Sequence, residues 1–374
     1  MLIGVLGAGQ LGRMLALAGI PLGVRFRFLD PTPDSPAGHV SEQIVGGFED
    51  PGAVKEFCRG LDIATWEFEN VPVAAARRVA EQVPMFPPPV ALEVGQDRLH
   101  EKLLFREMGL EVHPFGAAST FAEFEAVVAQ VGIPAVVKTR RGGYDGKGQA
   151  LLREGATRAD IAQAWESLGG VPVLVEKFVP FERELSIIGV RARTGELCAY
   201  PLTQNVHRAG ILRVSTAPCE GWSRPLQERA ERYARALMER LNYVGVLAIE
   251  FFEVGGALLA NEMAPRVHNS GHWTIEGAET SQFENHVRAV AGLPLGRTTP
   301  RGHSVMVNLI GNAPTPRAVL EVDRAHLHLY GKSPRSGRKI GHVTVNGPTA
   351  EAVAAPAERI RAMAADASGE APGR

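Results

Sequence analysis

Short apolar runs alternate with amphipathic stretches along most of the chain, a pattern that predicts a mixed α/β fold. Residues 2–7 form an apolar run, 8–23 contain a glycine turn and a helical stripe, and 24–30 form a second apolar run. Strand, helix and strand in this order indicate a βαβ unit that opens a parallel, helix-covered sheet. We expect a further strand of this sheet at 62–71 and a helix after it at 76–83.

The segment "FPPP" at 86–89 fits neither a helix nor a central strand, so it predicts a break. A helical stretch follows at 91–110, in one piece or in two pieces around Gly95. Beyond it the pattern predicts helices at 121–132, 158–170 and 227–243, strands at 171–179, 183–192, 196–210 and 211–218, and hairpins at 134–154 and 244–266.

Three domains are therefore expected: a Rossmann-like α/β domain at 1–97, a central α+β domain at 98–297 and a small β-rich domain at 298–374. Short strand patterns at 303–311, 326–331 and 339–347 support the third domain. The last dozen residues are expected to fray.

Composition narrows the class of protein. The 374 residues are 45% hydrophobic and carry 40 Lys+Arg against 41 Asp+Glu, so no strong net field would attract nucleic acid or a membrane. No apolar run is long enough to span a bilayer, and the first residues read as a strand and not as a signal peptide. Three scattered cysteines, Cys58, Cys198 and Cys219, fit a reducing compartment. We expect a cytoplasmic protein.

The loop "RRGGYDGKGQ" at 140–149 is rich in glycine and in cations, and it follows a strand pattern that ends near Lys138. Unshielded backbone N–H groups in such a loop can wrap around phosphate oxygens. The alternative is a hairpin turn with a solvated, charged tip. The loop alone does not decide between the two.

The first turn, "GAGQLG", places Gly7, Gly9 and Gly12 in the G-x-G-x-x-G spacing of a dinucleotide fingerprint, with Asp30 at the end of the next strand. Any tight strand-to-helix turn needs similar glycines. An oxidoreductase is therefore an alternative, but it leaves the loop at 140–149 without a role.

The hairpin at 244–266 carries Glu250 and Glu262 on its two arms. A three-residue turn centred on Gly256 would make the two carboxylates face each other, and a two-residue turn would put them on opposite faces. Facing carboxylates suit Mg²⁺, which leaves positions open for phosphate oxygens. The alternative is two solvated acids, although Glu250 lies in an apolar run where an unpartnered carboxylate is costly.

Two polar segments follow the hairpin. "RVHNSGHW" at 266–273 spaces His268 and His272 as a zinc site would, but Asn-Ser-Gly between them disfavours a helix, so we interpret the segment as a substrate-facing wall. In "SGRKIGH", Arg338 and Lys339 follow a turn and could clamp a phosphate, or they could simply be solvated.

Taken in order, "LGAGQLGRML", "KTRRGGYDGKGQ", "YPLTQNVHRAGILR", "EMAPRVHNSGHWT" and "SGRKIGH" resemble the 5-(carboxyamino)imidazole ribonucleotide synthetase family of the ATP-grasp superfamily. The resemblance runs from residue 2 to about 345. It implies ATP- and bicarbonate-dependent carboxylation of aminoimidazole ribonucleotide through carboxyphosphate, by a homodimer that uses Mg²⁺, for which Mn²⁺ can substitute.

The resemblance also implies a role for individual residues. The catalytic residues would be Lys138, Arg266, His268 and Asn269, and the metal ligands would be Glu250 and Glu262. The ribonucleotide would be bound by Gly9, Gln10, Leu11, Arg338 and Lys339. The nucleotide would be bound by Arg98, Lys138, Gly143, Tyr144, Asp145, Gly146, Lys147, Gly148, Gln149, Glu176, Lys177, Phe178, Val179, Glu184, His207, Asn261 and Glu262. The segment 143–149 would close as a lid. Ala264 stands where many superfamily members have an asparagine metal ligand.

Three alternatives stay open at this point. A sibling ATP-grasp ligase, or a formate-dependent transformylase acting on another purine ribonucleotide, would share the nucleotide residues and differ in the acceptor. A nucleotide-binding sensor would lack turnover. The proton acceptor for the amine has no candidate in the sequence.

Overall fold

The structure is a computed structural model that describes residues 1–143 and 148–368. A four-stranded parallel sheet in the order β3-β2-β1-β4 opens the chain, as the alternating patterns predict. Its elements are β1 (Leu2–Leu6), α1 (Gln10–Gly19), η1 (Ile20–Leu22), β2 (Arg25–Asp30), β3 (Glu42–Val45), α2 (Pro51–Cys58), β4 (Ile63–Trp66) and α3 (Val73–Ala80).

Two buried contacts at the end of β4 dock this sheet onto the rest of the molecule. The indole Nε1 of Trp66 donates to the carbonyl oxygen of Pro265 at 2.9 Å, and Thr65 Oγ1 lies 3.0 Å from His286 Nε2. Because both groups are buried, each would be costly to leave without a partner. The docking brings the residues after β4, Glu67 and Glu69, to the edge of a large cavity.

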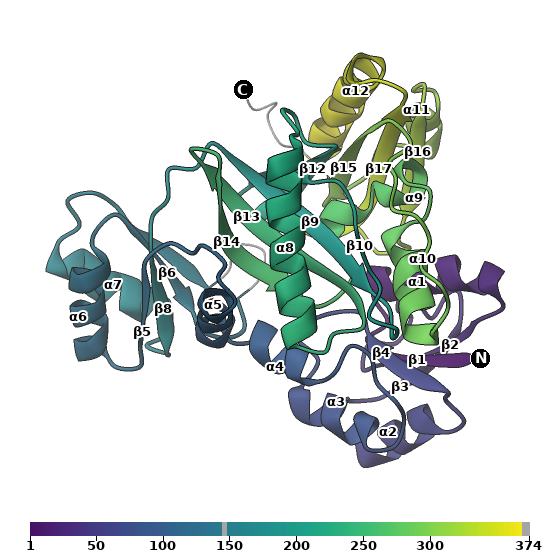
Figure 1. Ribbon diagram of the computed structural model, residues 1–374, viewed down its shortest axis with the longest axis horizontal. Coiled ribbons are helices and arrows are strands. Elements are labelled where there is room, and N and C mark those ends of the chain that lie inside the picture. Colours follow the sequence, from purple (N-terminus) through teal and green to yellow (C-terminus); the bar gives the residue numbers. More distant parts are fainter. Residues whose placement is uncertain (144–147, 369–374) are drawn as a thin grey trace.

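The segment 86–89 forms the expected break, and the helical stretch after it is in two pieces, α4 (Val90–Gly95) and α5 (Arg98–Glu107). A four-stranded antiparallel sheet follows in the order β5-β8-β6-β7. Its elements are β5 (Phe115–Ala118), α6 (Phe121–Val131), β6 (Ala135–Thr139), β7 (Gln149–Leu152), α7 (Arg158–Ser167) and β8 (Val173–Lys177). This lobe, on the left of Figure 1, carries the glycine loop between β6 and β7.

The largest sheet runs β14-β13-β9-β11-β12-β15-β17-β16, with β10 beside β9. Its elements are β9 (Arg183–Arg191), β10 (Leu197–Ala199), β11 (Thr203–Arg208), β12 (Ile211–Ala217), α8 (Arg224–Arg240), β13 (Gly245–Val254), β14 (Ala257–Ala264), η2 (Asn269–Gly271), α9 (Thr274–Gly277), α10 (Gln282–Ala291), β15 (His303–Ile310), α11 (Pro316–Leu320), β16 (Ala325–Leu329) and β17 (Lys339–Gly347). Helix α8 packs on this sheet through Ala230, Ala234 and Leu237, as its stripe predicts (Figure 1).

The three C-terminal strands extend this sheet, because β15 pairs with β12. The expected fraying from about residue 364 is wrong up to Ser368, where helix α12 (Ala350–Ser368) ends. This helix buries Val353, Ala357, Ile360 and Ala364 on the C-terminal strands. The expected domain boundaries at 97/98 and 297/298 stay predictions. In the described part of the chain, every helix is too short or too polar to cross a lipid bilayer.

Candidate active site

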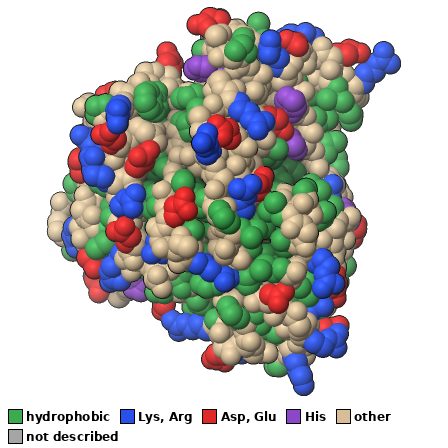
Figure 2. All heavy atoms as spheres, turned by 45° about the vertical axis from the view of Figure 1, so that its right-hand side comes forward, with side chains coloured by type: hydrophobic (Ala, Val, Ile, Leu, Met, Phe, Trp, Pro, Cys, Tyr) green, Lys and Arg blue, Asp and Glu red, His purple; other side chains and the backbone are tan. Residues whose placement is uncertain are grey.

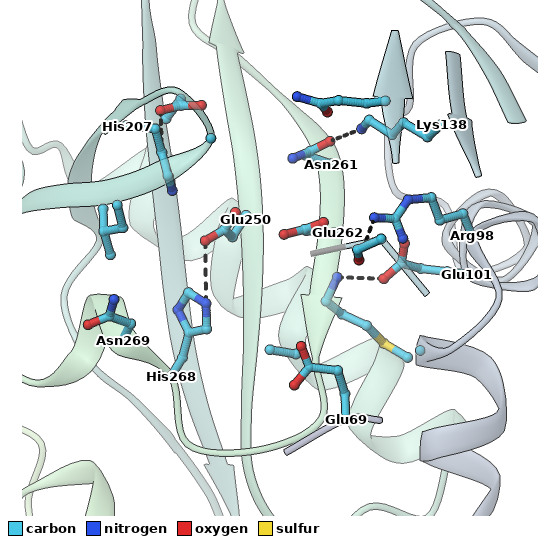
Figure 3. Close-up of a pocket in the computed structure, with 18 of the residues that line it drawn as sticks. Glu69, Arg98, Glu101, Lys138, His207, Glu250, Asn261, Glu262, His268 and Asn269 are labelled. Carbon is cyan, nitrogen blue, oxygen red and sulfur yellow. Dashed lines mark hydrogen bonds and ion pairs between the residues drawn. The ribbon is translucent and has the colours of Figure 1, made fainter. Parts of the chain in front are cut away.

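A cavity of about 600 Å³ lies where the two β-sheet lobes and the N-terminal sheet meet. Residues from segments far apart in the sequence line it, as Figure 3 shows. The sequence-predicted site residues among them are Gln10, Leu11, Arg98, Lys138, Gly143, Gln149, Glu176, Lys177, Phe178, Val179, Glu184, His207, Glu250, Asn261, Glu262, Arg266, His268, Asn269 and Lys339. Gly9, Gly148 and Arg338 do not line it, and Tyr144, Asp145, Gly146 and Lys147 lie outside the described residues.

The two hairpin carboxylates face each other, although the turn is the one that seemed to exclude this arrangement. Gly255 and Gly256, both with positive φ, form a two-residue turn between β13 and β14. A bulge at Asn261 then shifts the register by one residue, so that Glu250 pairs directly with Glu262. Directly paired residues on neighbouring strands point to the same face, and both carboxylates lie in the cavity (Figure 3).

The environment of Glu250 disfavours its charge. Burial and the negative charge of Glu262 raise the pKa of Glu250 to about 7, and His207 opposes the shift only in part. Two hard oxygen donors that repel each other in a cavity fit a divalent cation. Within residues 1–143 and 148–368, no three His, Cys, Asp or Glu side chains gather into one metal-binding group.

Lys138 lies on the opposite wall, in a cluster of charged side chains. Its Nζ is 2.6 Å from Glu176 Oε2. It is also 3.4 Å from the side-chain oxygen of Asn261 (Figure 3). The buried Glu176 also contacts Lys102 and His113, each at 2.9 Å. Burial alone would favour the neutral acid, but the neighbouring ammonium groups hold the pKa of Glu176 well below its usual value.

Helix α5 anchors the base of the glycine loop. Its N-cap residue, Asp97, accepts from Leu99 N–H and also accepts from Nε and Nη2 of Arg140, at 3.1 and 2.7 Å. Arg98 donates at 3.1 Å to the carbonyl oxygen of Gly143, the last residue described before position 148. The predicted lid therefore begins at a point that the helix holds in place.

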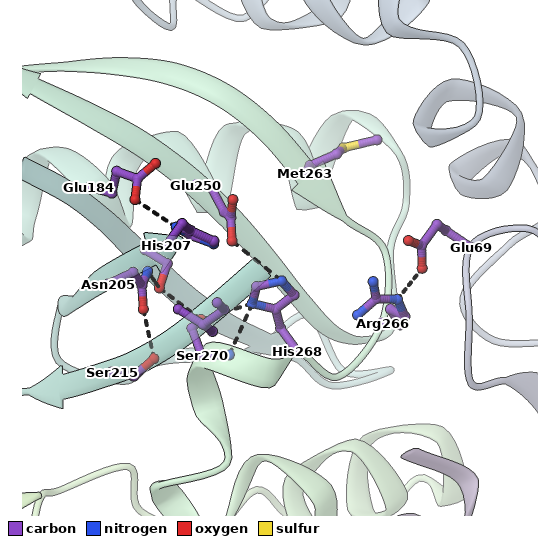
Figure 4. Close-up of polar contacts among 12 residues, drawn as sticks. Glu69, Glu184, Asn205, His207, Ser215, Glu250, Met263, Arg266, His268 and Ser270 are labelled. Carbon is purple, nitrogen blue, oxygen red and sulfur yellow. Dashed lines mark hydrogen bonds and ion pairs between the residues drawn. The ribbon is translucent and has the colours of Figure 1, made fainter. Parts of the chain in front are cut away.

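A buried hydrogen-bonded chain, drawn in Figure 4, fixes the orientation of His268. Asn205 donates to Ser186 at 2.9 Å, Ser186 donates to Ser270 at 2.8 Å, and Ser270 Oγ lies 2.8 Å from His268 Nδ1. The backbone N–H of Ser270 also points at Nδ1. Since Nδ1 accepts, the ring hydrogen is on Nε2, which lies 3.4 Å from Glu250.

The same loop presents two further polar side chains. Arg266 forms an ion pair with Glu69, which reaches across from the segment after β4 (Figure 4). Asn269 has both amide atoms buried without a partner among the described residues, although it lines the cavity. Buried polar atoms are normally satisfied, so Asn269 is positioned to bind a ligand.

Another pair lines the cavity where β9 and β11 lie side by side. His207 Nδ1 lies 2.6 Å from Glu184 on the neighbouring strand, in contact across the β9–β11 ladder (Figure 4). This hydrogen bond and the acids of the hairpin raise the pKa of His207, although burial opposes the charge. A short hydrogen bond therefore joins an imidazole and a carboxyl group at the rim of the hairpin.

The first glycine turn already holds a carboxylate. The N–H groups of Gly9 and Gly12 both donate to Glu67, and the N–H of Ala8 donates to Asp30 at 3.0 Å. An internal acid therefore occupies the N-terminus of α1, where a dinucleotide phosphate would lie, which removes the physical basis of the oxidoreductase alternative. The predicted contact of Gly9 with substrate stays a prediction.

Several residues of the site were missed by sequence reasoning. Lys332, whose Nζ contacts Gln10, has a pKa lowered to about 8 by burial, and the nearby Arg338 and Lys339 add to this shift. Glu101 and Lys102 are buried on α5. A signal existed for them, because both charged residues occupy the inward stripe of α5 that continues to Phe105. Glu69 and Lys332 have no such signal.

Three family models cover most of the chain. The ribonucleotide synthetase preATP-grasp domain matches residues 1–96, the ATP-grasp domain 103–283, and the phosphoribosylaminoimidazole carboxylase C-terminal domain 304–356. Among curated relatives, the N5-carboxyaminoimidazole ribonucleotide synthase of Pseudomonas aeruginosa is 50% identical over 345 residues, which are 92% of this chain and 94% of the relative.

Solved structures agree over the whole chain. The N5-carboxyaminoimidazole ribonucleotide synthetase of Thermus thermophilus superposes with a TM-score of 0.93 at 55% identity and full coverage of both chains. The N5-carboxyaminoimidazole synthase of Aspergillus clavatus, in complex with ADP and 5-aminoimidazole ribonucleotide, gives a TM-score of 0.87 at 31% identity over 96% of this chain and 98% of its own.

Proposed function

The chain belongs to the N5-carboxyaminoimidazole ribonucleotide synthase family, and we propose how its residues divide the work of the reaction. The enzyme is an ATP-grasp ligase that carboxylates 5-aminoimidazole ribonucleotide with ATP and bicarbonate in purine biosynthesis. The observation that carries our assignment is the facing pair Glu250 and Glu262, directly beside Asn261 and opposite Lys138 in one cavity.

The nucleotide lies between the two β-sheet lobes in this proposal. Lys138 and Arg98 neutralise phosphate oxygens, and the segment 176–179 runs beside the base. Glu184 binds the ribose hydroxyls with its partner His207. Negative charge spreads over the phosphoryl oxygens during transfer, so cations placed beforehand lower the barrier. The loop around 143–149 closes over the phosphates, and the anchoring of Gly143 by Arg98 supports this role.

Glu250 and Glu262 would hold Mg²⁺, or Mn²⁺ in its place. Their oxygens are suitable ligands, and the mutual repulsion that raises the pKa of Glu250 would be relieved by a cation. Ala264, which stands where many relatives in the superfamily have asparagine, offers no side-chain oxygen, so Glu250 and Glu262 would be the side chains that hold the ion. The ion supplies charge neutralisation and orientation of the phosphates when bound.

The acceptor side of the reaction falls to the loop 266–272 and the basic residues near β17. Bicarbonate attacks the γ-phosphorus and displaces ADP, which gives carboxyphosphate. The exocyclic amine then attacks the carbon of carboxyphosphate, and phosphate and a proton are released. Arg266, fixed by Glu69, and Asn269 hold the carboxyl oxygens. His268 donates a hydrogen bond to these oxygens from Nε2, since Nδ1 already accepts from the backbone N–H of Ser270. Lys332, Lys339 and Arg338 bind the ribonucleotide phosphate, and Gln10 and Leu11 line that end of the cavity.

Location and assembly complete the proposal. The three cysteines are free, which fits a cytoplasmic enzyme. The face that carries α1 and α10 exposes the apolar side chains of Leu17, Ile20, Leu22 and Leu293 by 37–48%. Figure 2 shows hydrophobic side chains gathered on the face turned forward from the right of Figure 1, and we propose a homodimer through this surface.

The assignment of the reaction is tested by phosphate release. The purified protein is mixed with ATP and bicarbonate, and candidate acceptors are added one at a time. We expect stoichiometric phosphate only with aminoimidazole ribonucleotide. Release with formate and another purine ribonucleotide would favour a transformylase, and nucleotide binding with no acceptor-dependent release would favour a sensor.

A further inference from the structure

Lys102 is a buried lysine that the proposed mechanism does not use. It lies on α5 with 1% of its surface exposed, and its Nζ contacts Glu176 Oε1 at 2.9 Å and the carbonyl oxygen of Ala260 at 3.1 Å. An ammonium group is costly to bury unless its partners are well placed. Its two partners lie on strands of different sheets, Glu176 on β8 and Ala260 on β14.

The contact with Ala260 supports the bulge that makes the two metal-site acids face each other. Phe251 pairs with Ala260 and Glu250 pairs with Glu262, so Asn261 is the extra residue. A bulge removes backbone groups from the ladder. Lys102 donates to the carbonyl group of Ala260, and the neighbouring Glu101 accepts from Met263 N–H at 2.7 Å. Helix α5 thus satisfies the backbone on both sides of Asn261.

The contact between Lys102 and Glu176 also affects Lys138, because Lys138 binds the same carboxylate. Glu176 is 2% exposed, and its Oε2 is the atom that holds Lys138 at 2.6 Å. Its other oxygen, Oε1, is bound by Lys102 and by His113. If Lys138 turns to a phosphate, Glu176 still has a cation beside it. Without Lys102, Lys138 would be the remaining lysine on a buried carboxylate, and its release would leave that charge poorly compensated.

We propose that Lys102 is a positioning residue for the nucleotide: it neutralises Glu176 so that Lys138 can leave it for the phosphates, and it fixes the bulge that presents Asn261. The inference rests on the proposed function, because it takes Lys138 as a phosphate ligand and ATP as the nucleotide. It adds a residue that touches no substrate and acts through two that do.

The test compares four proteins: wild type, Lys102→Met, Glu176→Gln and the double variant. Apparent KM is measured for ATP and for aminoimidazole ribonucleotide. Lys102→Met should raise the KM for ATP about ten- to a hundredfold, the size of a lost charge-assisted contact. The KM for the ribonucleotide should change by less than about threefold. The double variant should recover the part of the loss that acts through Glu176, because a neutral glutamine side chain at position 176 no longer retains Lys138. The part that acts through the carbonyl group of Ala260 should remain.

Arg106→Met is the matched control, because Arg106 is an exposed cation on the same helix, one turn further on. It should leave both KM values unchanged. Equal increases for both substrates in Lys102→Met, or a double variant no better than the single one, would overturn the proposal.

Two outcomes need separate treatment. If Lys102→Met does not fold, the double variant decides, because removing both members of a buried pair is better tolerated than removing one. A KM for ATP near that of Glu176→Gln then supports the proposal, and a double variant that fails to fold while Glu176→Gln folds overturns it. A wild-type protein without acceptor-dependent turnover would instead refute the proposed function.

Discussion

Glu250→Gln should stabilise the metal-free protein while it abolishes turnover. The pKa of Glu250 is raised from 4.5 to about 7, chiefly by burial and secondarily by Glu262. Between these values the folded state holds a proton that the unfolded state has lost, so stability falls as the pH rises. A tenfold change in proton affinity corresponds to about 1.4 kcal/mol. The charged carboxylate of Glu250 therefore destabilises the folded state by roughly 3 kcal/mol above pH 7. Glutamine has nearly the same shape and no charge.

The assay is urea unfolding in the presence of EDTA at pH 8 and at pH 4.5. At pH 8 the variant should unfold at a higher urea concentration than the wild type, with a free energy of unfolding about 2–3 kcal/mol larger. This difference should vanish at pH 4.5, because Glu250 is then protonated in the folded wild type. Mg²⁺-dependent turnover should be lost. If the free energy of unfolding does not rise at pH 8, or rises equally at both pH values, the charge of Glu250 does not destabilise the fold in the way we infer.

Glu253→Gln is the matched control on the same strand. Glu253 is also buried, but it forms an ion pair with Arg183. Removing its charge leaves a guanidinium with a weakened partner, so this variant should lose stability at pH 8. If the two substitutions, three residues apart, change the free energy of unfolding in opposite directions, the effect at Glu250 comes from its repulsion by Glu262 and not from burial alone.

The other predictions concern the metal site, the loop and the phosphate clamp. Glu262→Gln should abolish Mg²⁺-dependent turnover with the fold intact by circular dichroism, and wild-type rates would remove Glu262 from the site. Gly148→Val should slow turnover and uncouple ATP hydrolysis from carboxylation, because Gly148 has φ of +70° and a Cβ would lie 2.7 Å from Thr139 Oγ1. Gly155→Val, with φ of +78° and no neighbour within 4 Å, is the control, and tight coupling in Gly148→Val would argue against a gate. Replacing Arg338 and Lys339 with alanine should raise the KM for the ribonucleotide about ten- to a hundredfold per residue, measured against the KM for ATP, and equal changes would indicate a structural role.

The elements were predictable because their patterns are local. The parallel opening, the two-piece helix around Gly95 and the hairpin of Glu250 and Glu262 all follow from apolar periodicity and glycine placement. Helix α12 was missed because its alanine-rich sequence, with Pro356 inside it, gives a weak stripe. Only the strands it packs against show why Ile360 and its neighbours are buried.

The geometry of the site was less accessible, because it depends on contacts between distant segments. The turn at Gly255 and Gly256 has two residues, and only the bulge at Asn261 restores the facing arrangement of the acids. The local sequence does not predict that bulge, because the side chains that hydrogen-bond to its backbone lie on the distant helix α5. The ion pair of Arg266 with Glu69 likewise joins residues 197 positions apart.

The fate of a bicarbonate oxygen tests the proposed chemistry most directly. If the γ-phosphoryl group passes to bicarbonate, the bridging oxygen leaves with the phosphate when the amine attacks. With ¹⁸O-labelled bicarbonate, ATP and aminoimidazole ribonucleotide in a rapid-mixing assay, we predict one labelled oxygen in each phosphate released and the remaining label in the product's carbamate. Unlabelled phosphate from a tightly coupled reaction would contradict the carboxyphosphate route that the cations, the facing acids and the closing loop support.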